Sequence, residues 1–345
     1  MNSIIALDDV ANDPPVMLSW EWMNNEYAKA ATKLGYSVEY LIPKRVFRMS
    51  HQGKSALVVD AIVPLNDGSA TYLADHKGMA KERFAQEGVP CPSGISLPRV
   101  EYRRLTSRTV SALGFSRPDV FPLVVKPEVG TLKGQGVVTN IVDEPTLFDV
   151  LDESFELYGS VIIEEYYGRM TDHRLLVLDG KLLAAAQRHP GEVVGDGTST
   201  IEELIHAVNA KRRKEWKLRF GAVRVGRELH QTLAEQGFRI ADIPENGVNV
   251  RLMNVANLSS GGYSVNCTDQ VAQANIDFAV RATEAMGLRL AGVDVLCHDI
   301  TKPIGPGNGG ILEVNASPGV VLHYFPRAGG PTDVIPELMK AVFVD

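Results

Sequence analysis

A carboxylate and a carboxamide stand two residues apart in the segment GGILEVNASPGV, residues 309–320. The apolar neighbours predict a strand, and successive side chains of a strand point to opposite faces, so Glu313 and Asn315 share one face. A buried face does not normally hold a carboxylate and an amide unless they bind something. A strand with one face in solvent explains the pair equally well, so this segment leaves both interpretations open.

The segment LAGVDVLCHD predicts a second strand, in which Asp294 is flanked by apolar residues. A carboxylate in such surroundings requires a cation. If the two strands are neighbours, Asp294, Glu313 and Asn315 present hard oxygen ligands, which Mg²⁺ prefers together with nucleotide phosphates. The chemistry indicated is a magnesium site, and no histidine-rich zinc site is indicated.

The segment VVKPEVGTLKGQGV predicts a strand that ends near Lys126, followed by a glycine-rich turn. Gly130, Gly134 and Gly136 would let the backbone approach a phosphate closely, and Lys126 and Lys133 would add positive charge. The P-loop pattern is absent, because no Gly-Lys-Ser/Thr opens a helix here. An ordinary flexible hairpin is the competing interpretation.

In VIIEEYYGRMTDHR an apolar strand ends in Glu164 and Glu165, and Asp172 follows. Such a strand end could offer polar groups to a purine and a carboxylate to ribose hydroxyls, although a simple polar turn has the same pattern. Arg188 follows a run of small residues that should be buried, so its charge needs a partner. For His173, His189 and His323, structural hydrogen bonds are favoured over a role as a base.

The composition is that of a globular chain: 345 residues, 45% hydrophobic, 22% charged, with a net charge of −7. That charge argues against nucleic-acid binding. The one basic stretch, AKRRKEWKLRFGAVRVGR, is interpreted as a solvated face or a substrate loop, with nucleic acid as a minor alternative. Three widely spaced cysteines (Cys91, Cys267, Cys297) form no disulfide or zinc pattern. Without a signal peptide or a membrane-spanning run, we expect a cytoplasmic protein.

The chain reads as an alternation of short strands and amphipathic helices. Residues 1–70 combine the strands SIIALDD, SVEYLIP and ALVVDAIVP with a helix in WMNNEYAKAATKLGY. A hairpin is expected across Asp179-Gly180, and a helix beginning near residue 201 is capped by Ser199 or Thr200 with Glu202 or Glu203. Other helices are predicted in HKGMAKERFAQ, EPTLFDVLDESFEL, QVAQANIDFAVRATEAMG and PTDVIPELMKAVF; a long polar excursion runs to about residue 247.

Taken in order, these segments resemble the ATP-grasp superfamily, and within it the ATP-grasp module of cyanophycin synthetase and of bifunctional glutathione synthetases. The resemblance covers about residues 76–345, from the Lys77 helix to HYFP. It implies an α/β (α+β) ATP-grasp fold. The expected domains are a small α/β domain (1–75), a central subdomain with the glycine-rich loop (76–157), and a C-terminal subdomain with metal and substrate sites (158–345).

The resemblance also implies a role for each matching position. Nucleotide binding is implied for Lys77, Lys126, Gly130, Lys133, Gly134, Gly136, Glu164, Glu165, Tyr167 and Asp172. Metal binding is implied for Asp294, Glu313 and Asn315, with ATP and two Mg²⁺ ions as cofactors and Mn²⁺ as an alternative. Arg188 and Lys126 would act in catalysis. Substrate contacts are implied for Arg251, Asn257, Ser259, Ser260, Gly261, Ser317 and Gly319.

The expected reaction is ATP-dependent formation of an amide between small amino-acid or peptide substrates through an acyl phosphate. A phosphotransferase and an ATP-binding regulatory protein stay as alternatives, and a homodimer is an open expectation. Met253 stands where the family usually has an arginine, which Arg251 could replace. Residues 1–70 do not resemble the N-terminal domain of cyanophycin synthetase, and no Mur-ligase-like half follows. We therefore expect one amide bond per cycle and no polymer.

Overall fold

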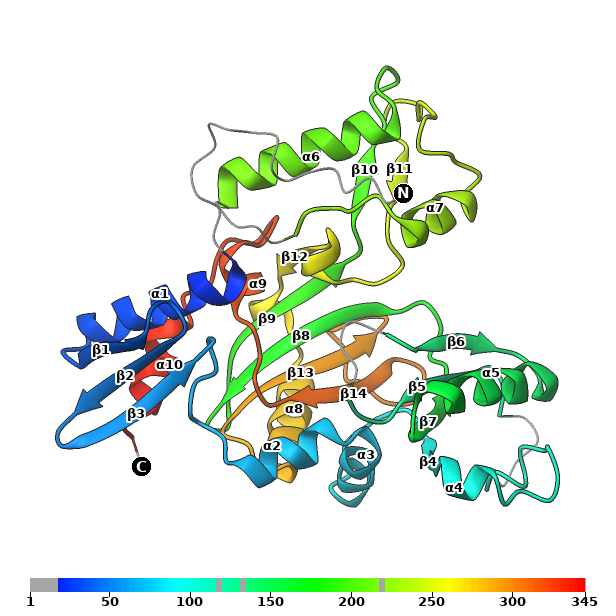
Figure 1. Cartoon of the computed structure of the whole chain (residues 1–345), viewed down its shortest axis with the longest axis horizontal. Coiled ribbons are helices and arrows are strands. Elements are labelled where there is room, and N and C mark those ends of the chain that lie inside the picture. The colour runs from blue at the N-terminus through cyan, green and yellow to red at the C-terminus, as the bar shows by residue number, and fades with distance from the viewer. Residues whose placement is uncertain (1–17, 116–119, 131–134, 217–220, 345) are drawn as a thin grey trace. The chain divides into compact units, whose positions relative to one another are not determined.

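The computed structural model describes residues 18–115, 120–130, 135–216 and 221–344. The predicted strand SIIALDD, Lys133 and Gly134 lie outside these ranges. Two compact units are each assembled from separate segments of the chain (Figure 1). Unit 1 comprises residues 1–65, 184–268 and 319–345, and unit 2 comprises 66–183 and 269–318. The three sequential domains inferred above stay a prediction.

One half of unit 2 is the antiparallel sheet β4-β7-β5-β6. Its strands are β4 (Gly94–Pro98), β5 (Leu123–Pro127), β6 (Val138–Ile141) and β7 (Ser160–Glu165). The amphipathic helix α5 (Glu144–Leu157) packs on this sheet, because its apolar residues recur on one face. Leu147, Leu151 and Phe148 fill the core between them. The short helix α4 (Arg99–Tyr102) follows β4.

The other half of unit 2 contains the neighbouring antiparallel strands β8 (Thr171–Leu178), β13 (Leu290–Cys297) and β14 (Gly309–Asn315). Apolar residues of all three strands are fully buried, as expected for a sheet covered by helices: Leu175, Leu176, Val177, Val293, Val295 and Ile311. Helix α8 (Gln273–Ala285) packs on β8 and β13, and α2 (Gly68–Asp75) and α3 (Lys77–Gln86) pack against β14. The predicted hairpin across Asp179-Gly180 is confirmed, with both residues at positive φ.

Strand β9 (Lys181–His189) carries the chain from unit 2 into unit 1, where it pairs with β12 (Tyr263–Asn266). Unit 1 also holds the sheet β1-β2-β3, whose strands are β1 (Ser37–Ile42), β2 (Val46–His51) and β3 (Lys54–Val59). Helix α1 (Ser19–Lys33) packs on α10 (Ile335–Ala341) and on β1 and β2.

The remaining part of unit 1 is built on the antiparallel pair β10 (Glu192–Val194) and β11 (Asn249–Arg251). Helix α6 (Ile201–Trp216) packs on β10, and α7 (Arg227–Ala234) packs on β11 (Figure 1). The predicted capping box of α6 is confirmed for Thr200 and Glu203, since each side chain accepts a hydrogen bond from the other's backbone N–H.

Several elements differ from the expectation. The stretch up to about residue 247, which was predicted to be a polar excursion, contains α7 and is followed by β11. Leu229 and Leu233 of α7 are fully buried. Strand β2 was not predicted, because only Phe47 and Met49 of VFRMSH are buried. Helices α2, α4 and α9 (Val321–Tyr324), and the 3-10 turns η1 (Leu258–Ser260) and η2 (Thr268–Gln270), were not predicted either, because they are too short for a periodic signal.

Candidate functional site

The two carboxylates predicted to bind metal lie opposite each other in unit 2. Strands β13 and β14 are neighbours, as predicted, and Asp294 pairs directly with Glu313. Opposite residues of an antiparallel pair point to the same face, so both carboxylates share one face of the sheet. Asn315 pairs with Gly292 and donates its Nδ2 hydrogen to the Gly292 carbonyl at 3.2 Å. The sheet therefore brings the three predicted ligands together.

Burial and mutual repulsion make it unfavourable for both of these carboxylates to be charged. Burial of Glu313 and the negative charge of Asp294 raise the pKa of the Glu313 carboxyl, while the charges of Lys77 and Lys126 act in the opposite direction. Arg174 on β8 pairs with Asp294, with Nε near Oδ1 and Nη2 at 3.1 Å from Oδ2. The lysines and the carboxylates thus already interact within unit 2.

The donor set fits a divalent cation. Two carboxylates and an amide oxygen are hard ligands of the kind that Mg²⁺ takes, and a cation between Asp294 and Glu313 would relieve the repulsion that raises the Glu313 pKa. No group of three or more His, Cys, Asp or Glu side chains suited to a metal occurs among the described residues. The predicted set contains only two such side chains, so that result does not bear on it.

A buried ion-pair triad lies beside these carboxylates. Glu164 on β7, 4% exposed, has one carboxylate oxygen 2.7 Å from Lys126 Nζ and the other 2.7 Å from Lys81 Nζ. Burial alone would raise the pKa of Glu164, but the charges of Lys126 and Lys81 hold it below its ordinary value. Glu164 is therefore the counter-ion of two lysines in this structure.

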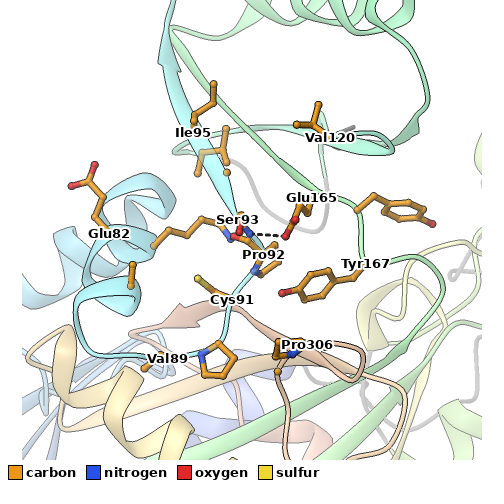
Figure 2. Close-up of a pocket in the computed structure, with 18 of the residues that line it drawn as sticks. Glu82, Val89, Cys91, Pro92, Ser93, Ile95, Val120, Glu165, Tyr167 and Pro306 are labelled. Carbon is orange, nitrogen blue, oxygen red and sulfur yellow. Dashed lines mark hydrogen bonds between the residues drawn. The ribbon is translucent and has the colours of Figure 1, made fainter. Parts of the chain in front are cut away.

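A cavity of about 1200 Å³ opens next to the triad in unit 2. Its lining includes Glu165 and Tyr167 from the end of β7, the segment 88–96 and the loop around Pro306. Figure 2 shows the Tyr167 ring pointing into this space, with the Ser93 N–H donating to Glu165 at 3.1 Å. A cavity of this size, with mixed apolar and polar walls, has room for a whole nucleotide.

Of the predicted adenine contacts, Glu165 and Tyr167 line the cavity, whereas Glu164 is not among its lining residues. Burial, with the negative charge of Glu165, raises the pKa of the Tyr167 hydroxyl, which therefore stays protonated and can donate a hydrogen bond. Asp172 is half-buried near the start of β8. Lys77 begins α3, and its backbone N–H donates to the Glu128 carbonyl.

Two glycines of the predicted phosphate loop are described, and both have positive φ: Gly130 at 75° and Gly136 at 74°. A Cβ at Gly136 would also lie 2.6 Å from Tyr158 Oη, whereas a Cβ at Gly130 would meet nothing. Only glycine adopts this conformation without strain. Glycine is therefore favoured at both positions, and at Gly136 for a second, steric reason.

The predicted catalytic arginine lies in unit 1. Arg188 on β9 pairs with Ser264 on β12, while the adjacent pair, His189 and Tyr263, lies on the opposite face of the two strands. Ser264 is fully buried and its hydroxyl donates to the Leu322 carbonyl. Arg188 is half-buried, in agreement with the expectation that its charge requires a partner.

The predicted substrate loop Asn257–Gly261 forms a compact turn around its own asparagine. The Asn257 side chain accepts hydrogen bonds from the backbone and the hydroxyl of Ser259, both at 2.9 Å, and Ser260 donates to the Asn257 carbonyl at 3.1 Å. Gly261 closes the turn at φ 98°. Ser317 and Gly319, on either side of buried Pro318, are exposed.

Met253 and Arg251, the two positions considered for the family's arginine, have different surroundings in unit 1. Met253 is 7% exposed and belongs to the apolar cluster beneath α6 and α7, so it does not change the charge of a polar pocket. Burial of the unbranched, apolar Met253 side chain in this cluster stabilises the fold. Arg251 faces Glu235, with Nη2 and Oε2 3.3 Å apart.

Two charged residues of the site were missed by the sequence interpretation: Lys81 and Arg174. Lys81 lies four residues after Lys77 on α3, hence on the same helix face, and that spacing could have signalled it. Arg174 lies in the quoted segment YYGRMTDHR, and only the pairing of β8 with β13 shows that it faces Asp294. Neither the ion pair of Lys81 with Glu164 nor that of Arg174 with Asp294 follows from local sequence.

No protein-family model matches the chain. The curated relatives include cyanophycin synthetase of Trichormus variabilis, 34% identical over 79% of this chain and 29% of the relative. Cyanophycin synthetase of Crocosphaera subtropica is 33% identical over 92% of this chain and 34% of the relative. Glutathione biosynthesis bifunctional protein GshAB of Mannheimia succiniciproducens is 28% identical over 74% of this chain and 34% of the relative.

Among solved structures, the bifunctional glutathione synthetase from Pasteurella multocida matches 93% of this chain and 44% of its own, with a TM-score of 0.68 and 24% identity. At that identity the match establishes the fold. The chain spans about a third of the length of the curated relatives reported above. We expected residues 1–70 not to resemble cyanophycin synthetase. The match over 92% of the chain corrects that expectation, because it extends into these residues.

The fold of the chain is that of the bifunctional glutathione synthetase structure, and two of its antiparallel strands, β13 and β14, bring Asp294 and Glu313 opposite each other. The chain belongs to the ATP-grasp superfamily, and its relatives within that superfamily are the cyanophycin synthetases and the bifunctional glutathione synthetases. The predicted fold class is thereby confirmed. No helix among the described residues has the length and apolar character needed to cross a membrane.

Proposed function

We propose that the protein is an ATP-dependent carboxylate–amine ligase that joins small amino-acid or peptide substrates. One observation carries this proposal: within one unit, Asp294 lies opposite Glu313 on neighbouring strands, Lys126 is held by Glu164, and a cavity of about 1200 Å³ is present. Lysines suit phosphates, paired carboxylates suit the metal that accompanies them, and the cavity suits the base.

Each residue then has a defined task. Tyr167 and Glu165 hold the base, and Lys126, oriented by Glu164, and Lys77 bind the phosphates. Asp294, Glu313 and Asn315 hold Mg²⁺, which neutralises phosphate charge when bound. The turn with Gly130 and Gly136 covers the phosphates and excludes water.

In the reaction, a substrate carboxylate attacks the terminal phosphorus of ATP, and ADP leaves. The resulting acyl phosphate is electrophilic, so an amine displaces phosphate and the amide forms. Arg188 stabilises the negative charge that develops on the transferred phosphoryl group. The sheltering glycine turn matters here, because water would otherwise hydrolyse the acyl phosphate.

The test is trapping with hydroxylamine in the presence of ATP and Mg²⁺, using a panel of amino acids and dipeptides as carboxylate donors. A ligase gives ADP, phosphate and a hydroxamate, detectable by mass spectrometry, even when the natural amine is unknown. A stable phosphorylated product that no amine or hydroxylamine displaces would identify a phosphotransferase. Nucleotide binding without ADP formation for any donor would identify a regulatory protein.

A further inference from the structure

Asn66 has no task in the mechanism proposed above, yet its whole side chain is engaged in hydrogen bonds within unit 2. Its Nδ2 donates to the carbonyl oxygens of Leu290 and Ala316, each at 2.7 Å. Its Oδ1 accepts from the backbone N–H groups of Arg289 at 2.9 Å and Leu290 at 3.1 Å. A carboxamide offers two donor hydrogens and an oxygen with two lone pairs, so every position of the Asn66 side chain is used.

These bonds continue a strand ladder at the point where β14 ends. The last pair of β13 and β14 at this end is Gly292 with Asn315, so Leu290 extends beyond it. Opposite residues of an antiparallel pair exchange N–H···O bonds in both directions, and Asn66 exchanges such bonds with Leu290. The carboxamide therefore takes the place of a strand residue opposite Leu290, and its second donor hydrogen holds the Ala316 carbonyl.

The bond to Ala316 holds the residue next to Asn315, the amide ligand of the proposed metal site. Asn315 Nδ2 donates to the Gly292 carbonyl at 3.2 Å. Its Oδ1 is the other polar atom of the same carboxamide, and a hard cation binds through oxygen. Because Ala316 is joined directly to Asn315, holding the Ala316 carbonyl limits how far the Asn315 backbone can turn.

A second contact holds the same turn. A Cβ added at Gly292 would lie 2.8 Å from Pro318 Cβ and 2.8 Å from Arg174 Nη1. Pro318 therefore packs directly on Gly292, and Arg174, which pairs with Asp294, reaches the same glycine. The segment 316–318 is thus held at its first residue by Asn66 and at its last residue by Gly292.

We propose that Asn66 is a positioning residue for the metal site: it holds the end of β14 so that Asn315 presents its amide oxygen on the same sheet face as Glu313. Asn66 acts through Leu290 and Ala316 and is not itself a ligand. This role rests on the metal site of the proposed ligase, and it names a residue outside β13 and β14 on which the ligand geometry depends. Removing groups that orient metal ligands typically weakens metal binding by about 10- to 100-fold.

The test is equilibrium binding of Mn²⁺ to the intact chain in the presence of ADP, measured by the EPR signal of free Mn²⁺. Asn66→Ala removes all of these bonds, whereas Asn66→Asp keeps those that Oδ1 accepts and loses those that Nδ2 donates. Both substitutions should raise the Kd of Mn²⁺ about tenfold or more. The negative charge added by Asn66→Asp would by itself favour a cation, so weaker binding by this variant must come from lost positioning. ADP binding without metal should stay within about twofold of wild type, because Asn66 does not line the cavity.

Asn24→Asp is the matched control, because Asn24 makes contacts of the same kind in unit 1. Its Nδ2 donates to the Lys44 and Arg45 carbonyls, both at 2.8 Å, and its Oδ1 accepts from the Ala61 N–H at 2.9 Å. Asn24→Asp should lower the melting temperature, as Asn66→Asp does, but leave the Kd of Mn²⁺ within about twofold of wild type. If Asn66 had only a structural role, the two variants would behave alike.

Wild-type Mn²⁺ affinity in either Asn66 variant, shown by thermal melting to be folded, would overturn the proposal, and so would an equal loss of affinity in Asn24→Asp. A wild-type protein that binds no Mn²⁺ in the presence of ADP would overturn both the metal assignment and the role of Asn66. Failure of the ligase function alone has a different signature: Mn²⁺ binding still depends on Asn66, but ATP and Mg²⁺ yield no hydroxamate with any donor.

Discussion

The proposed mechanism depends strongly on the negative charge of Glu313, which would bind the metal ion. Glu313→Gln removes one negative ligand opposite Asp294 and should lower ADP formation by at least about 100-fold at saturating Mg²⁺. The fold should persist, because the substitution also relieves the repulsion that raises the Glu313 pKa. The measurements are steady-state ADP release and thermal melting, with exposed Glu284→Gln as the control. Near-normal activity would refute the metal assignment.

The triad of Glu164 with Lys81 and Lys126 predicts an asymmetry in stability. Glu164→Gln leaves two buried ammonium groups without their counter-ion and should cost about 3–5 kcal/mol of unfolding free energy. Lys81→Met leaves one carboxylate paired with one lysine, so it should cost clearly less. Urea unfolding of both variants measures the two values. If Lys81→Met proved the more damaging substitution, Glu164 would not be the shared counter-ion.

The same triad predicts a pH dependence. The pKa of folded Glu164 lies below its ordinary value of 4.5, so its stabilisation is fully present above pH 4.5 and is lost as the pH falls through the folded value. The stability difference between wild type and Glu164→Gln should therefore be constant near neutrality and shrink below about pH 4.5. Urea unfolding at several pH values checks this, and a difference that grew on acidification would contradict it.

Local elements were predicted well wherever a short pattern determines them. The hairpin at Asp179-Gly180 and the capping box of α6 need only adjacent residues, and both are confirmed. Contacts between distant segments do not follow from local patterns, because these do not specify strand neighbours; the β13–β14 pairing was expected only as the arrangement that brings Asp294 and Glu313 together. Lys81 meets Glu164 across 83 positions only because β4 pairs with β7 after the turn that follows α3. Met253 shows the same limitation, since its burial depends on α6 and α7.

The glycine turn between β5 and β6 predicts a graded response to alanine. Gly130→Ala and Gly136→Ala both place a side chain at positive φ, which costs about 1 kcal/mol each. Only Gly136→Ala adds a clash, with Tyr158 Oη and Pro127 Cγ, so it should destabilise the protein more and weaken ATP binding more. Chemical unfolding and nucleotide titration measure both effects. Equal losses would indicate that the clash is relieved by a small shift of Tyr158.

At the scale of the whole molecule, the comparisons limit what can be transferred from relatives. Matches cover most of this chain but about a third of the curated relatives' length, so a relative's complete activity does not follow for this protein. The cavity and the paired carboxylates both lie within unit 2 of this chain. The proposal for this protein is therefore confined to the chemistry of that site, amide formation with ATP.

Lys126 and Arg188 belong to different compact units. The proposed mechanism gives them different tasks, so we expect their substitution to separate nucleotide binding from the chemical step. Lys126→Ala removes a buried cation next to the cavity and should raise the Kd for ATP about tenfold or more. Arg188→Ala should leave that Kd within about twofold and lower the maximal rate about 100-fold, because the charge stabilised by Arg188 develops only during phosphoryl transfer. Nucleotide titration and single-turnover ADP formation measure these quantities, with Arg239→Gln as the control. If Arg188→Ala changed the ATP affinity alone, its catalytic role would be withdrawn and Arg188 would become a nucleotide contact.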